Sequence, residues 1–142
     1  MKIFGFSLLL LFAFLACEQN QYPSKKWTIT PVKNLPIRTS NQAVSEGFIN
    51  DKAYLFSFGG IDSTKLFSGI HQRSFRYDIK ADKWQEISSL PDTLGKIANA
   101  TSRINDIIYI IGGYHVFKDG NERSSNMVHR FNIKQNKFLD DG

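Results

Sequence analysis

Apolar residues are distributed in two different ways along the chain. Residues 3–16 are almost wholly apolar (IFGFSLLLLFAFLA). Later, compact apolar runs at 52–58 and 107–111 are followed by segments in which apolar and polar residues partly alternate, at 74–79 and 127–133. Short runs of this kind, bounded by Gly, Asp and Asn, are typical of β-strands. No later segment has the spacing of an amphipathic helix.

The strand pattern occurs twice, at a spacing of roughly 50 residues. Each copy starts with Ile-Asn-Asp, at Ile49 and Ile104, and continues through an apolar run to a diglycine. Arg-aromatic-Asx-Ile then follows, as RYDI in the first copy and RFNI in the second. A lysine and an aromatic residue, Trp84 or Phe138, come next. Because these independent landmarks keep nearly one spacing, the chain contains two copies of one structural unit.

An apolar strand that ends in Gly-Gly and is followed by aromatic positions, at this period, resembles the kelch repeat. The resemblance covers residues 27–142 and implies an all-β fold, a β-propeller whose blades each have four antiparallel strands. We expect a first blade within 42–88 and a second within 97–142. Their expected strands are 42–49, 52–58, 74–79 and 83–87, then 97–104, 107–111, 127–133 and 137 onward.

Two blades are too few to close a ring, since propellers have about four to eight. Residues 26–31 resemble an outer strand without its own blade, and in many propellers such a strand completes the last blade. The chain also stops within the outer strand of the second blade. We therefore expect an N-terminal fragment of a longer propeller with an incomplete ring. The alternative is a ring in which several copies contribute two blades each.

Residues 1–16 have the features of a signal peptide, because Lys2 precedes an apolar run shorter than the roughly 20 residues of a membrane-spanning helix. The next residue is Cys17, and the sequence FLAC resembles a bacterial lipobox, with Phe14 in place of the usual Leu, Val or Ile. The resemblance implies lipid attachment at Cys17, a polar tether at 17–25 and membrane anchoring at the bacterial cell envelope. An ordinary cleaved signal peptide and a short membrane anchor are the alternatives.

The composition argues against several classes of function. The chain is 22% charged and 42% hydrophobic, and its formal net charge of +5 is spread along the sequence. A basic stripe for nucleic acid is therefore not expected. Cys17 is the single cysteine, which leaves no intrachain disulfide and no cysteine-based zinc site. The three histidines lack metal-ligand spacing, so we expect neither a metal nor a cofactor.

Candidate ligand contacts lie in the two longest connections, 61–73 and 114–126, which follow the diglycines. Loops on a rigid scaffold are where binding residues concentrate. The polar residues that we single out there are His71, Arg73, His115, Asn121, Glu122 and Arg123. Such groups suit a sugar or an acidic ligand, and solvated loop residues without a function are the alternative interpretation.

The sequence contains no Ser-His-Asp order or phosphate-binding glycine loop that indicates a catalytic site, so whether the protein is an enzyme stays open. Our first hypothesis is a cell-envelope module that binds a protein or a glycan. The alternative is an exported sugar mutarotase similar to the kelch-type N-acetylneuraminate epimerases. A galactose-oxidase-like copper enzyme is disfavoured, since that family crosslinks a tyrosine to a cysteine and Cys17 is assigned to lipid.

Overall fold

The computed structural model describes residues 26–139. The predicted signal peptide, Cys17 and the predicted tether lie outside the described residues, and so do 140–142. The chain divides into one unit that ends at Pro31 and a second that begins at Val32. The outer strand expected at 26–31 is not assigned, because a strand requires backbone hydrogen bonds to a neighbouring strand. That this segment completes another blade stays a prediction.

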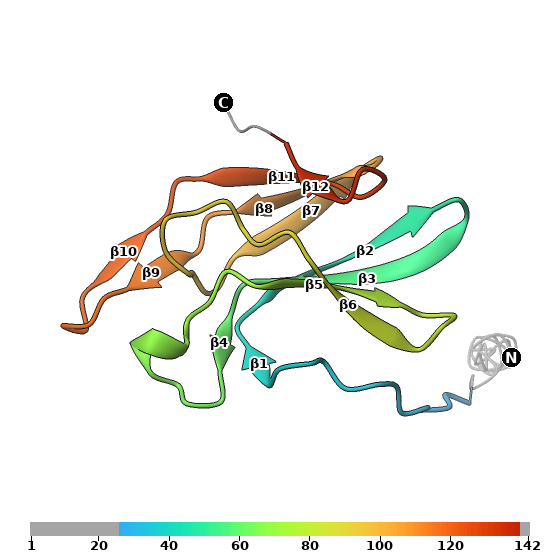
Figure 1. Cartoon of the computed structure of the whole chain (residues 1–142), viewed down its shortest axis with the longest axis horizontal. Helices are drawn as coiled ribbons and strands as arrows, with labels where there is room; N and C mark the ends of the chain where they lie inside the picture. The colour runs from blue at the N-terminus through green and yellow to red at the C-terminus, as the bar shows by residue number, and fades with distance from the viewer. Residues whose placement is uncertain (1–25, 140–142) are drawn as a thin grey trace, which may run out of the picture. The chain divides into compact units, whose positions relative to one another are not determined.

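The second unit contains two four-stranded antiparallel sheets (Figure 1), so the all-β prediction of four-stranded blades is confirmed. The first blade has the order β2-β3-β5-β6 and the second the order β7-β8-β11-β12. Their bounds are β2 Ala43–Ile49, β3 Lys52–Phe58, β5 Ser74–Asp78, β6 Lys83–Ile87, β7 Ala100–Ile104, β8 Ile107–Ile111, β11 Val128–Asn132 and β12 Lys137–Phe138. Among the described residues, no helix is long and apolar enough to cross a membrane.

The start of β7 differs from the prediction by three residues. Ala98 has a φ of 57°, which is left-handed backbone that a strand does not accommodate. Ile97 instead forms an isolated antiparallel bridge with Tyr114. The segment before Ala100 is therefore attached to the connection that follows β8, not to the strand ladder of its own blade.

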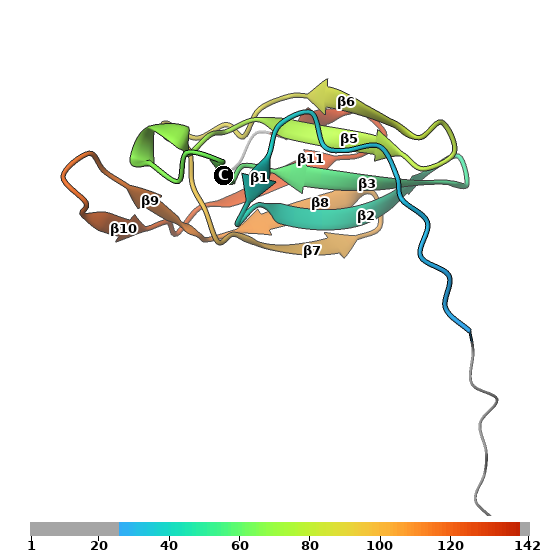
Figure 2. The ribbon, with the colours of Figure 1, turned by 90° about the horizontal axis from the view of Figure 1, so that it is seen from below.

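Short strand pairs occupy both long connections. β1 (Thr39–Ser40) pairs with β4 (Ile61–Asp62), and a 3₁₀ turn, η1 (Phe67–Gly69), follows. In the second connection β9 (Tyr114–Val116) pairs with β10 (Glu122–Ser124). Figure 1 places β4, η1, β9 and β10 at one end of the two blades, which we call the loop end, and Figure 2 shows β9 and β10 at that end from a second side.

The core lies between the two blades. Alternation along β3 directs Phe56 and Phe58 toward the second blade, where their rings lie 5.8 and 5.5 Å from the ring of Phe131. Nine buried residues form this cluster: Ala43, Phe56, Phe58, Ile87, Leu90, Ile108, Ile110, Phe131 and Ile133. At the edge strands, Arg103 Nε of β7 lies 3.1 Å from Glu46 Oε1 of β2.

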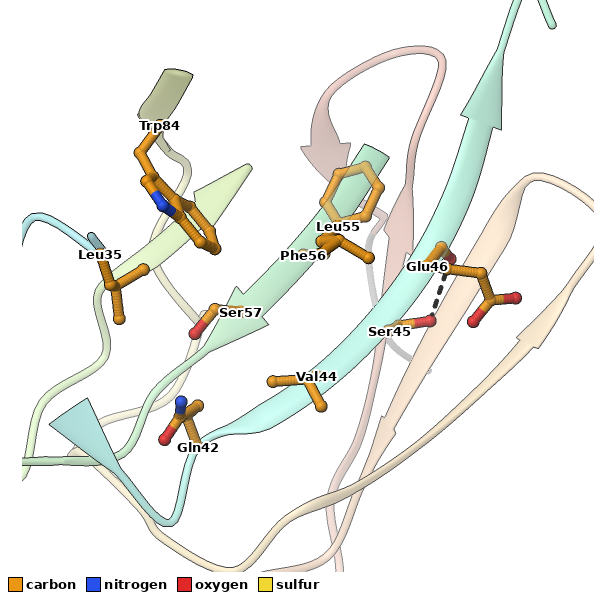
Figure 3. A pocket seen from close by; sticks show the side chains of 9 residues that line it. All are labelled: Leu35, Gln42, Val44, Ser45, Glu46, Leu55, Phe56, Ser57 and Trp84. Atoms are coloured by element: carbon orange, nitrogen blue, oxygen red, sulfur yellow. Dashed lines mark hydrogen bonds between the residues drawn. The ribbon is translucent and has the colours of Figure 1, made fainter. Parts of the chain in front are cut away.

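The outward faces of both blades keep large apolar side chains exposed, among them Val44 and Leu55 on the first blade and Ile104 and Val128 on the second. Figure 3 shows a pocket of about 480 Å³ on the first of these faces, in which Trp84, Leu35, Val44 and Leu55 surround an apolar hollow. In a propeller these are the faces that neighbouring blades cover, and the ring formed by the described residues is open.

Candidate functional site

The connection between β6 and β7, residues 88–99, is held between the two long connections at the loop end. Leu90 N–H donates to the Gln72 carbonyl at 2.9 Å, and Ile97 N–H donates to the Tyr114 carbonyl at 3.1 Å. Gly95 passes so close to the first blade that a Cβ on it would lie 2.6 Å from the Ile70 carbonyl oxygen. This connection is therefore a fixed element between the blades and a rigid support for its side chains.

Asp92, in this connection, is the centre of a buried group of charged and titratable side chains. Its Oδ2 lies 3.3 Å from Lys96 Nζ and 3.3 Å from His129 Nε2, while its Oδ1 lies 3.9 Å from His115 Nε2. The side chains of Lys96 and His129 are fully buried, and that of Asp92 is 9% exposed. Lys96 also donates to Ser125 Oγ at 3.5 Å. The group thus connects the interblade connection to β9 and β11 of the second blade.

The Asp92 carboxyl is ionised at neutral pH. Burial alone raises its pKa, but the Thr93 backbone N–H, the Lys96 ammonium and the His129 ring together hold the pKa below its ordinary value. The charge is stable because donors that are already in place replace the water lost on burial.

A pocket of about 580 Å³ opens beside this group. Most of its lining residues have polar side chains, and they come from the interblade connection and from the second long connection with the residue that follows it. The lining residues are Pro91, Asp92, Thr93, His115, Arg123, Ser124, Ser125, Asn126 and Met127. Pockets of this size accommodate small-molecule ligands. Hydroxyl, amide, carboxylate and guanidinium groups together supply both donors and acceptors.

The hydrogen bond of His115 fixes which of its ring nitrogens is protonated. Nδ1 lies 3.0 Å from the Gly95 carbonyl, which only accepts hydrogen bonds, so Nδ1 carries the proton. In the neutral ring Nε2 is then an acceptor, and it lies 3.9 Å from a carboxylate that also only accepts. In that neutral tautomer, Nε2 is the proton-accepting nitrogen of His115, and His115 lines the pocket.

Arg123 is the direct cross-strand neighbour of His115 in the β9–β10 pair. Directly opposite residues on antiparallel strands have their side chains on the same face, so the side chains of Arg123 and His115 lie on the same face of the hairpin. The Arg123 guanidinium lies 5.4 Å from the centre of the Phe117 ring. A cation above an aromatic face is attracted to it, which limits the positions that the guanidinium samples.

Of the six residues singled out from sequence, the structure brings His115 and Arg123 together at the pocket. Asn121 instead closes the hairpin turn, with its backbone N–H 3.0 Å from Asp119 Oδ1 and its Nδ2 2.7 Å from Asp119 Oδ2. Glu122 is exposed and pairs with Val116. Neither lines the pocket.

His71 and Arg73 lie on the first blade, away from this lining. Arg73 binds Glu86 through two hydrogen bonds of 2.8 Å, between side chains that are both about half exposed. His71 Nε2 lies 3.3 Å from Thr39 Oγ1, and burial, followed by the nearby Arg73 charge, lowers the pKa of the imidazole. His71 is thus neutral at physiological pH, and Arg73 is already occupied by a carboxylate.

Sequence reasoning did not select Asp92, Lys96, Ser125 or His129 as site residues. The available signal was opposite charge four residues apart, at Asp92 and Lys96, in a segment without strand periodicity. Nothing in that spacing indicates that both side chains are buried. Within residues 26–139, no three His, Cys, Asp or Glu side chains are grouped so as to hold a metal ion.

Comparison with known proteins supports the fold. Residues 100–139, which span β7 to β12, match the family described as the kelch motif. No curated protein sequence matches the chain. The solved structure of a protein named YjhT is similar, with a TM-score of 0.54 and 21% sequence identity over 76% of this chain. This chain covers 28% of the length of that one. The identity is low, so the likeness shows the fold and not the activity.

Proposed function

We propose that the chain belongs to a cell-envelope module whose loop end binds a glycan. The proposal starts from the fold, because kelch-type β-propeller blades form binding or scaffold modules. The fold accounts only for the general role of binding or scaffolding. The choice of ligand and the cellular location are our proposal.

The pocket beside Asp92 carries the proposal for a glycan. Sugars present many hydroxyl groups, each of which donates and accepts, so their sites need both kinds of partner in fixed positions. The ionised Asp92 carboxylate is an acceptor, Asn126 and Ser125 supply donors and acceptors, and Pro91 and Met127 provide apolar surface. A protein ligand would need a wider interface than a pocket of about 580 Å³.

Binding is tested with the full-length protein in detergent on a glycan array, followed by calorimetry on the glycans that bind. We expect Asn126→Ala to weaken binding, because it removes a side chain of the pocket lining. Glu122→Gln is the matched control, since Glu122 is exposed on the same hairpin and does not line the pocket. Equal affinity of the wild-type protein and Asn126→Ala for every bound glycan would place the binding site elsewhere and remove this pocket from the proposal.

The envelope location rests on Cys17 and the apolar segment before it. We expect mass spectrometry of the native N-terminal peptide to show a diacylglycerol-modified cysteine. Cys17→Ser is then expected to move the protein from the membrane fraction to the soluble fraction. An unmodified cysteine in the native protein contradicts the lipid anchor, whatever the array shows.

Sugar mutarotation is a second candidate, which the acceptor nitrogen of His115 beside a polar pocket favours. Mutarotation needs a group that removes a proton from the anomeric hydroxyl and returns it to the ring oxygen, and it needs no cofactor. NMR exchange spectroscopy on α-N-acetylneuraminate with the full-length protein tests this activity. Anomerisation at the rate of buffer alone leaves the binding module as the sole proposal.

A further inference from the structure

We propose that the ligand of this pocket carries a negatively charged group, a carboxylate or a phosphate, that Arg123 binds. The inference rests on the proposed function in one respect, namely that the pocket beside Asp92 is the ligand site. It goes further by naming the charge of the ligand and the residue that selects it.

The negative charge of the pocket, the Asp92 carboxylate, is already paired with cationic or hydrogen-bonding side chains of the protein. Asp92 is the one acidic residue among the lining residues, and its carboxylate lies 3.3 Å from both Lys96 Nζ and His129 Nε2. A cation at 3.3 Å in a buried setting neutralises most of the field of a carboxylate. Asp92 therefore does not make the pocket strongly negative, although it is a pocket residue.

Arg123 then remains as a positive charge at the pocket. Its Cζ atom lies over the Phe117 ring, 5.4 Å from the ring centre. Carboxylates and phosphates bind at the N–H edge of the same group, through two parallel hydrogen bonds. The ring contact and an anion can therefore be held by the same side chain, and the contact limits the positions that the guanidinium samples.

Matched probes test the inference: D-glucuronate against D-glucose, together with glucose 6-phosphate and inorganic phosphate. The full-length protein in detergent is titrated with each by calorimetry. We expect glucuronate or glucose 6-phosphate to bind at least about tenfold more tightly than glucose, since a charge-assisted hydrogen bond contributes about that factor. The better of the two acids identifies carboxylate or phosphate as the preferred group.

The variants assign the effect to one side chain. Arg123→Gln is expected to abolish the preference for the acids, and Arg123→Lys to retain part of it, because the charge stays but the fork is lost. Lys118→Gln is the matched control, an exposed cation on the same hairpin outside the pocket lining. Arg123 is itself exposed, so its replacement is not expected to unfold the blade.

The outcomes separate this inference from the proposed function. Equal affinity for glucose and glucuronate overturns the anion inference and leaves glycan binding standing. An acid preference that survives Arg123→Gln also overturns it. Binding of inorganic phosphate that Arg123→Gln abolishes, without binding of any sugar, supports the anion inference and contradicts the glycan proposal. Failure of all four probes to bind contradicts the anion inference, while the glycan array still decides the proposed function.

Discussion

The carboxylate of Asp92 and the ammonium of Lys96 lie 3.3 Å apart, and both belong to the connection between the two blades. The Lys96 side chain is fully buried and that of Asp92 nearly so. Buried charges are costly unless each has a partner, so this pair has to form whenever the connection adopts its native position. Since Gln72 of the first blade donates to the backbone carbonyl of Asp92, the same residue is attached to both blades.

Asp92→Asn is expected to destabilise the fold by about 3 kcal/mol, because it removes the countercharge of a buried lysine. The free energy of unfolding is measured by urea titration, monitored by circular dichroism. Asp119→Asn is the control, since Asp119 is an exposed turn residue. The double variant Asp92→Asn with Lys96→Met should recover part of the loss. A double variant no more stable than Asp92→Asn contradicts the electrostatic explanation.

The same carboxyl predicts a dependence of stability on pH. The pKa of Asp92 is lower in the folded protein than in the unfolded chain, where it is about 3.9. The unfolded state therefore binds the proton first as the pH falls. The contribution of the ionised Asp92 carboxyl to stability is complete above its pKa in the unfolded chain. That contribution is lost as the pH falls through its pKa in the folded protein. Between pH 7 and pH 3 the wild-type protein should lose more stability than Asp92→Asn, and parallel curves would contradict this.

The strands could be predicted from sequence because each characteristic residue pattern occurs in both copies of the repeat, so each copy supports the assignment made in the other. β3, β6 and β8 begin and end at the predicted residues, and the diglycines end β3 and β8 as expected. The start of β7 was wrong, because Ala98 adopts left-handed backbone and alanine gives no signal for it.

The pocket was only partly accessible to the same reasoning. His115 and Arg123 were selected because they are polar residues in a long connection, and the structure places them opposite each other across a hairpin. Asp92 and Lys96 lie in a segment that belongs to neither repeat. Their role depends on how two blades enclose that segment, a long-range relationship that no local pattern records.

Gly113→Ala is expected to destabilise the protein by about 2–5 kcal/mol, the sum of a strained backbone and an overpacked site. Gly113 has a φ of 83°, and a Cβ there would overlap the Asn99 side-chain oxygen and lie 2.7 Å from the Ile97 carbonyl oxygen. Gly120→Ala is a matched control. Its φ of 85° is nearly the same, but nothing lies within 4 Å of the added Cβ, so only the strain of about 1–2 kcal/mol applies. Equal losses in the two variants would assign the whole effect to backbone conformation.

Phe58→Ala tests whether the two blades unfold as one unit. The Phe58 side chain is fully buried, and its ring lies 5.5 Å from that of Phe131 and 6.1 Å from that of Phe138, both in the second blade. Removing a buried phenylalanine costs about 3–5 kcal/mol, through lost burial and the cavity left behind.

We expect this loss in a single cooperative transition, because the cavity opens at the interface that both blades share. Phe67→Ala is the control, since Phe67 lies in the 3₁₀ turn with 44% of its surface exposed, and the expected loss is below about 1 kcal/mol. Hydrogen exchange measured by blade distinguishes the two possibilities. If Phe58→Ala lowers protection in β3 and β5 but leaves β8 and β11 unchanged, the blades are independent folding units, and the shared aromatic cluster does not couple them.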